Sequence, residues 1–136
     1  MENVELPLIY RGVSRSVRQE LSREALKKVG LEHRMDHKPS EMSGGQQQRV
    51  AIARAIAQAP PVILADEPTG NLDSNSTKEI MDILKGLHNE GRTVILITHD
   101  NDIAAQAKRV IKIKDGKVES DSGQIVPVEE LQTAGA

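Results

Sequence analysis

The 136-residue sequence contains no cysteine, tryptophan or phenylalanine, and Tyr10 is its only aromatic residue. The absence of cysteine excludes disulfide bonds and thiolate metal sites. Nucleic acid is not expected as a ligand, because there is no aromatic platform for bases and the formal net charge of -2 provides no basic surface. No apolar run approaches the ~20 residues of a membrane-spanning helix. The composition predicts one cytosolic globular domain that reaches a membrane only through a partner.

Segments with helical and strand-like patterns alternate along the chain. Residues 15–29, 43–59 and 80–87 carry apolar residues at helical spacing. Two short apolar runs, 62–66 and 93–98, are typical of strands that are buried on both faces of a parallel sheet. This alternation predicts an α/β fold with a parallel sheet, in which ligands bind at the carboxyl ends of the strands.

All three helices have a predicted apolar face, and the first and third are each followed by a glycine, Gly30 and Gly91, that is typical of a C-cap. The expected core residues, at three- and four-residue spacing, are Val17, Leu21, Ala25 and Val29 in the first helix and Ile80, Ile83, Leu84 and Leu87 in the third.

Three features are predicted for the end of the chain. A short helix is expected over residues 101–108. Residues 110–119 alternate in polarity around Asp115-Gly116, the strongest short signal of a β-hairpin. The mostly polar or small residues of 120–136 predict a loosely held tail.

Ser43-Gly44-Gly45-Gln46 begins the helix at 43–59. Ser43 and Gln46 have the spacing of a capping box, in which each side chain bonds the other residue's backbone N–H. The two glycines allow an external group to approach the first N–H groups closely, and the helix dipole favours an anion such as phosphate. An ordinary capped helix start explains these residues equally well when they are considered alone.

Asp66 and Glu67 end the strand at 62–66. An acidic residue at this place can hold Mg²⁺ through water, and an adjacent carboxylate can polarise an attacking water molecule. Acidic pairs at strand ends are also common simply because they are solvated, so this pair alone is not decisive.

Together these segments closely resemble the nucleotide-binding domain of ABC transporters over residues 2–119. Met42 to Gln46 resembles the signature motif and Val62 to Asp66 the Walker B strand, while Glu67 matches the catalytic glutamate. Asn71-Leu72-Asp73 resembles the D-loop, and His99, 26 residues after Asp73, matches the switch histidine. The segments ENVELPLIYRG and LADEPTGNLDS are most similar to the lipoprotein-releasing and macrolide-exporting subgroup.

The resemblance implies a head-to-tail pair of domains with ATP between the P-loop of one and the signature helix of the other. The nucleotide-binding residues would be Ser43, Gly44, Gly45, Gln46 and Asp73. Glu67 would orient the attacking water, His99 would bridge to the γ-phosphate, and Asp66 would hold Mg²⁺ through water. A second ABC ATPase domain and an integral-membrane permease are the implied partners, and the implied location is the cytoplasmic face of the membrane.

The P-loop pattern G-x-x-x-x-G-K-[ST] does not occur in the sequence. Its closest match, Gly86 to Thr93, leads from a predicted helix into a strand, which is the reverse of a P-loop. We therefore expect a truncated ABC ATPase domain at 1–119, with a helical signature subdomain at 1–60 and an α/β part at 61–119, which is inactive alone. Loss of the P-loop strand is expected to expose a hydrophobic sheet edge and make folding marginal.

Three functions remain compatible with the sequence. In the first, the chain is the signature and catalytic portion of an ATP-hydrolysing subunit that drives export through a permease. In the second, it is a non-catalytic module that presents only its signature face to an intact ATPase. The third is a non-transport ABC ATPase, which the subgroup wording disfavours.

Overall fold

The computed structural model describes residues 1–36 and 38–123, which divide into two units, Met1–Ile97 and Thr98–Ala136. The first unit contains, in chain order, α1 (Glu2–Tyr10), α2 (Arg15–Lys28), short 3-10 turns at Glu32–Arg34 and Pro39–Glu41, α3 (Gly44–Ile56), β1 (Val62–Asp66), α4 (Ser74–Asn89) and β2 (Thr93–Ile97). The second contains α5 (Asn101–Ala104), β3 (Ile111–Lys114) and β4 (Lys117–Asp121). The mixed α/β fold with a parallel sheet and a C-terminal hairpin is as predicted.

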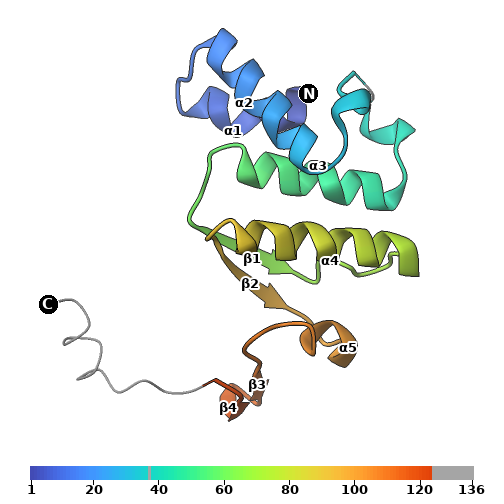
Figure 1. The fold of residues 1–136 in the computed structure, drawn as a ribbon, viewed down its shortest axis with the longest axis vertical. Coiled ribbons are helices and arrows are strands. Elements are labelled where there is room, and N and C mark those ends of the chain that lie inside the picture. The colour runs from blue at the N-terminus through green and yellow to red at the C-terminus, as the bar shows by residue number, and fades with distance from the viewer. Residues whose placement is uncertain (37, 124–136) are drawn as a thin grey trace, which may run out of the picture. The chain divides into compact units, whose positions relative to one another are not determined.

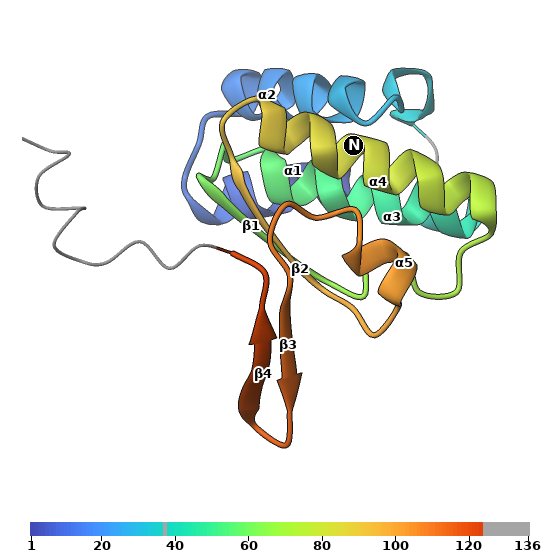
Figure 2. The same cartoon turned by 60° about the horizontal axis from the view of Figure 1, so that its bottom comes forward.

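The helix α4 forms the centre of the first unit. It lies between α3 and the two strands, as Figures 1 and 2 show. Its buried residues are Ile80, Met81, Leu84 and Leu87, so three of the four predicted core positions are confirmed. Met81 takes the place expected for Ile83, which is half-buried. From α3, the residues Ile52, Ala53, Ile56 and Ala57 complete this core.

The helices α3 and α4 run parallel, with their first turns at the same end (Figure 1). Gly45 packs on Ser76 near both helix starts, and about one turn further along Arg49 reaches Glu79. The two pairs have nearly the same separation in sequence, as required when helices run in the same direction. Both positive dipole ends therefore lie side by side.

The strands β1 and β2 pair in parallel from Val62 with Thr93 to Asp66 with Ile97. One face of this sheet includes the buried Ile63. On the other face Leu64 is 66% exposed and its register partner Ile95 is 48% exposed. The prediction of strands buried on both faces was therefore wrong, because the described helices cover only one face.

The helices α1 and α2 differ most from expectation. No helix was predicted at α1, which contains Pro7 but buries Val4 and Leu8 one turn apart. In α2 the predicted core residues Val17 and Leu21 are exposed, whereas the other two, Ala25 and Val29, are buried together with Ser22 and Leu26. The buried side of α2 is thus set by its C-terminal half.

The hairpin β3–β4 was predicted correctly. Asp115 and Gly116 have φ values of 52° and 73°, which is the left-handed pair required by a type I′ turn. β4 continues to Asp121, so the tail cannot begin at Ser120 as predicted, and residues 124–136 lie outside the described part. The helix α5 is shorter than the predicted 101–108. No helix among the described residues is long and apolar enough to cross a membrane.

Candidate functional site: two capped helix starts

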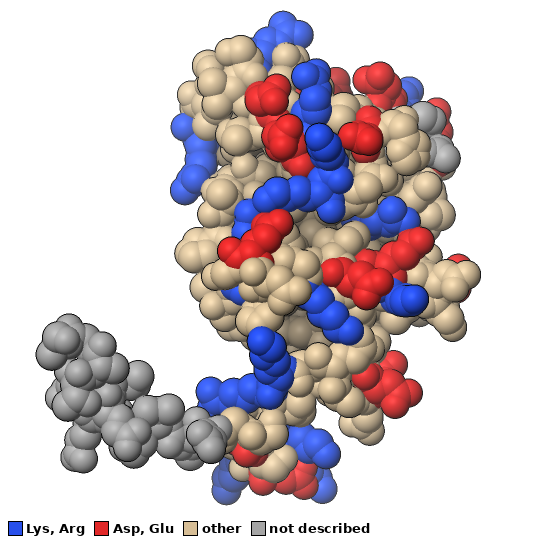
Figure 3. Space-filling model, viewed as in Figure 1, with Lys and Arg blue, Asp and Glu red and all other residues tan. Residues whose placement is uncertain are grey.

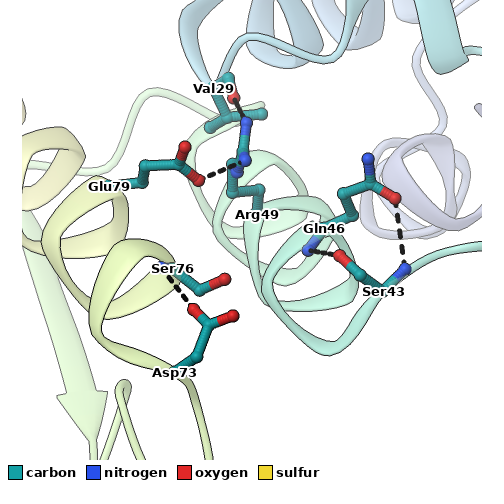
Figure 4. Close-up of polar contacts among 7 residues, drawn as sticks. All are labelled: Val29, Ser43, Gln46, Arg49, Asp73, Ser76 and Glu79. Atoms are coloured by element: carbon teal, nitrogen blue, oxygen red, sulfur yellow. Dashed lines mark hydrogen bonds and ion pairs between the residues drawn. The ribbon is translucent and has the colours of Figure 1, made fainter.

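The predicted capping box at the start of α3 is present. The backbone N–H of Gln46 donates to Ser43 Oγ at 3.2 Å, and the Ser43 N–H donates to Gln46 Oε1 at 3.1 Å (Figure 4). Ser43 itself is extended, with φ -65° and ψ 164°, as an N-cap residue should be. The capping box uses one early N–H group of the helix, that of Gln46. The N–H groups of Gly44 and Gly45 take no part in it.

The two glycines of α3 have different surroundings. Gly45 is buried, and a Cβ atom added there would lie 2.6 Å from Ser76 Oγ and 2.9 Å from Ser76 Cβ. Gly44 is exposed, and an added Cβ would meet only Leu72 Cδ2 at 3.5 Å, an ordinary contact. The close approach of α4 therefore explains why position 45 must be glycine, whereas only Gly44 presents open backbone to an incoming group. The sequence pattern did not separate these two roles.

Asp73 is the N-cap of α4. Its Oδ1 accepts the backbone N–H of Ser76 at 2.7 Å. This bond, together with the hydrogen bond from the Ser76 side chain, holds the pKa of Asp73 below its ordinary value of 3.8. The carboxylate is thus stabilised as an anion at a positive helix end. The predicted nucleotide-binding residues Ser43, Gly44, Gly45 and Asp73 therefore lie on two adjacent helix starts.

Arg49, on α3, contacts both α2 and α4. Its Nη2 lies 2.5 Å from Glu79 Oε2 on α4, and its Nη1 donates to the Val29 carbonyl at the end of α2 at 3.5 Å (Figure 4). The side chain is 19% exposed, whereas that of Glu79 is 53% exposed. The Arg49 side chain therefore connects helices rather than lying free on a solvated face.

The molecular surface carries charged side chains of both signs (Figure 3). Lys and Arg side chains are interspersed with Asp and Glu on the face that Figure 3 shows. This agrees with 18 basic against 20 acidic residues in the sequence. Attraction of an anion to α3 would therefore come from its backbone N–H groups and dipole rather than from a basic surface.

Asp66 and Glu67 lie where β1 ends. Asp66 is exposed, and Glu67 is half-buried with a φ of 46°. The Glu67 N–H donates to the Ile97 carbonyl of β2 at 2.8 Å, and its own carbonyl accepts from Gly70 at 3.1 Å. Left-handed backbone at a glutamate costs about 1–3 kcal/mol and is found where surrounding bonds enforce it. No group of three or more potential metal-ligating side chains occurs among residues 1–36 and 38–123.

His99 belongs to the second unit. It follows β2 by two residues, is exposed, and precedes Asp100, whose carboxylate caps α5 by accepting the Asp102 N–H at 2.9 Å. The structure thus groups the predicted residues of α3 and α4 and places Asp66 with Glu67 at the sheet. His99 is described only within its own unit.

The mixed α/β fold with a parallel sheet matches that of solved ABC ATPase cassettes. The family model for ABC transporters matches residues 2–70, and the chain belongs to this family.

Curated relatives agree with the macrolide-exporting subgroup suggested by the sequence. The chain is 57% identical over 122 residues to the macrolide export ATP-binding/permease protein MacB 2 of Aeromonas hydrophila, covering 90% of this chain and 19% of the relative. It is 51% identical over 134 residues to MacB of Hahella chejuensis, covering 98% of this chain and 20% of that protein. The chain therefore spans about one fifth of these relatives.

Solved cassettes share the fold. The dimeric structure of MJ0796, a bacterial ABC transporter cassette, matches with a TM-score of 0.73 and 49% identity, over 88% of this chain and 53% of that one. A post-hydrolysis dimer of MJ0796 bound to ADP and Pi gives 0.74 and 49%, over 89% and 54%. The cbiO1 protein of Clostridium perfringens gives 0.78 and 33%, over 87% and 48%. The family and fold inferred from the motifs are thereby confirmed, whereas the residue roles and the domain division at residue 60 stay predictions.

Proposed function

We propose that this chain is the signature-helix and Walker B portion of an export-type ABC ATPase, which drives transport through a permease on the cytoplasmic face of the membrane. The observation that carries the proposal is the start of α3. Its capping box fixes the first turn, Gly45 seats that turn on α4, and Gly44 leaves the N–H groups approachable. A helix start of this kind suits a phosphate.

ATP fits this site as a ligand that is shared with a second cassette. Bound ATP would supply the γ-phosphoryl group that is transferred to water. The N–H groups of Gly44 and Gly45 and the Ser43 hydroxyl would face that group, with Gln46 holding Ser43 in place. Asp73 would lie beside the same phosphate-facing edge and connect it to the partner cassette. These contacts would stabilise charge that develops on the γ-phosphate oxygens.

Glu67 is proposed as the residue that orients the attacking water. Its backbone N–H donates to the Ile97 carbonyl of β2 at 2.8 Å, which holds the residue at the end of β1. Asp66 would hold Mg²⁺ through water, which suits an exposed single carboxylate because this ion keeps much of its hydration shell. His99 would act as a donor to the γ-phosphate.

The main binding contacts for the nucleotide phosphates must come from another polypeptide segment. The sequence has no G-x-x-x-x-G-K-[ST], so it supplies neither the lysine nor the amide nest that holds the β- and γ-phosphates. The chain mixed with Mg-ATP alone is therefore expected to release phosphate at background rate.

The experiment is ATP-dependent association with an intact cassette. We would mix the chain with the ATP-binding region of the Aeromonas hydrophila relative and measure association by sedimentation, with and without Mg-ATP. Mg-ATP should strengthen association at least about tenfold, which corresponds to about 1.4 kcal/mol. Gly44→Asp should abolish this gain, because its carboxylate repels phosphate.

The same substitution provides its own folding control. An acidic residue in the first turn of a helix is favourable, so Gly44→Asp should unfold at the same or higher denaturant concentration than the parent chain. Gly44→Asn, nearly the same shape without the charge, should retain most of the ATP effect. An undiminished ATP effect in Gly44→Asp would contradict the proposed role of α3.

The absence of a P-loop sequence also favours a second function, in which the chain contributes only its signature face to an intact ATPase. Glu67→Gln separates the two functions in the same mixture when the intact cassette carries glutamine in place of its own catalytic glutamate, so that Glu67 is the one such carboxylate in the pair. Phosphate release should fall if Glu67 is catalytic, and it should remain unchanged if the chain is a non-catalytic module.

A further inference from the structure

Ser76 contacts both of the helix starts that make up the proposed nucleotide site. It lies in the first turn of α4, is half-buried, and follows the N-cap Asp73 by three residues. Its backbone N–H donates to Asp73 Oδ1 at 2.7 Å, and its hydroxyl is a second hydrogen-bond partner of the Asp73 side chain. Of these two bonds, only the second depends on which side chain stands at position 76.

The same hydroxyl also packs on the backbone of α3. A Cβ atom added at Gly45 would lie 2.6 Å from Ser76 Oγ, so no atom separates the hydroxyl from the Gly45 backbone. Figure 4 shows Ser76 and Asp73 on the side of α4 that faces α3. One oxygen therefore contacts the capping carboxylate of one helix start and the backbone of the other.

The position of the Asp73 carboxylate matters because this anion lies close to the N–H groups proposed to face phosphate. Leu72, the residue before it, is already in contact range of Gly44, since a Cβ atom there would meet Leu72 Cδ2 at 3.5 Å. A carboxylate is itself a good ligand for free N–H groups at a helix start, and it repels a nearby phosphate. Asp73 interferes least with phosphate when its charge is held on α4.

We propose that Ser76 is a positioning residue of the nucleotide site, whose hydroxyl holds the Asp73 carboxylate on α4 and so keeps the N–H groups at the start of α3 available to phosphate. Ser76 acts through Asp73 and does not itself contact the nucleotide. The inference rests on the proposed function, because it concerns the same helix start. It adds a residue that lies outside all of the motifs identified in the sequence.

The first test is the gain in association with an intact cassette that Mg-ATP produces. The chain and its variants would be mixed with the ATP-binding region of the Aeromonas hydrophila relative and followed by sedimentation, with and without Mg-ATP. Ser76→Ala should lower the gain from about tenfold to about threefold, which is about half of it on a free-energy scale. Ser76→Thr keeps the hydroxyl and should retain most of the gain.

The chain provides a matched control in the same helix turn. Ser74 is exposed, and Ser74→Ala also removes one hydroxyl, so it should leave the gain unchanged. The ion pair of Arg49 with Glu79, about one turn further along, still joins α3 to α4 in every variant. Because the gain is a ratio of association with and without nucleotide, a change in association common to both conditions cancels.

A second measurement uses the chain alone and separates the hydrogen bond from packing. The backbone and side-chain hydrogen bonds of Ser76 lower the pKa of Asp73. Carbon-13 NMR titration of the Asp73 carboxyl group should therefore give a higher pKa in Ser76→Ala than in the parent chain, and the parent value in Ser74→Ala. A residue that only filled the space beside Gly45 would not change this pKa.

Three results would overturn the inference. These are a Mg-ATP gain in Ser76→Ala equal to that of the parent chain, an unchanged pKa of Asp73 in that variant, and equal losses of the gain in Ser76→Ala and Ser76→Thr. The last would show that the shape of the contact with Gly45, rather than the hydroxyl, sets the gain. A parent chain without any Mg-ATP gain would instead reject the proposed function of α3.

Discussion

Gly45→Ala tests why α3 begins with residues that lack a side chain. The added methyl group would lie 2.6 Å from Ser76 Oγ and 2.9 Å from Ser76 Cβ, so the two helices must separate. Forcing an extra methylene into a packed contact costs about 1–3 kcal/mol. Alanine regains up to about 1 kcal/mol through its better helix propensity. We expect a net loss of about 1–2 kcal/mol in the free energy of unfolding.

The chain provides a control one residue away. At Gly44 the same methyl group meets Leu72 Cδ2 at 3.5 Å, which requires no movement. Gly44→Ala should therefore change stability by less than about 0.5 kcal/mol or increase it slightly. Urea unfolding followed by circular dichroism would compare the two variants in the same helix turn.

A double-mutant cycle then assigns the cost to one contact. Ser76→Gly removes both atoms that clash with the methyl group at position 45, so adding Gly45→Ala to it should cost much less than in the parent chain. The coupling free energy should be about 1–2 kcal/mol. Equal destabilisation by Gly44→Ala and Gly45→Ala, or a coupling near zero, would refute the packing explanation and return both glycines to a shared role.

Three further predictions follow from the polar contacts. Ser43→Ala should cost about 1 kcal/mol in urea unfolding, because it removes the acceptor for an early N–H, whereas Ser43→Asp should retain most of the stability. Arg49→Met should cost about 1 kcal/mol by the same assay and Glu79→Gln less than about 0.5, because the carboxylate is more than half exposed. The bidentate contact of Arg109 lowers the pKa of Asp121 to about 2. The hairpin should therefore lose this contribution as pH falls from about 4 to about 2, as followed by its amide NMR signals, and Asp121→Asn should remove that pH dependence.

Local signals in the sequence predicted local structure well. The Ser43 and Gln46 spacing identified the start of α3, and Asp115-Gly116 identified the hairpin turn. Gly30 and Gly91 follow α2 and α4 with φ values of 73° and 96°, as expected of glycines past a helix end. Each of these depends on a few adjacent residues whose geometry allows few alternatives.

Features that depend on tertiary contacts were less predictable. The helix α1 contains Pro7, which argues against a helix locally, yet burial of Val4 and Leu8 and the 2.8 Å ion pair from Glu5 to Arg18 on α2 stabilise it. The reason for glycine at position 45 required knowledge that α4 lies against α3 there. The position of His99 relative to Glu67 depends on two separate units, and neither sequence spacing nor the strand pairing fixes it.

The strands show how a prediction can fail structurally and still carry information. A strand with one covered face is expected to alternate apolar and polar residues, but β1 has apolar residues in both alternating sets, with Ile63 and Ala65 on one side and Val62 and Leu64 on the other. The sequence therefore predicts apolar packing on both faces of the sheet, whereas the described residues cover only one face. Val62, Leu64, Ile95 and Ile97 are each about half exposed, so each forgoes roughly half of the about 1.5–3 kcal/mol that complete burial of an aliphatic side chain provides. The same exposed residues account for the wrong burial prediction.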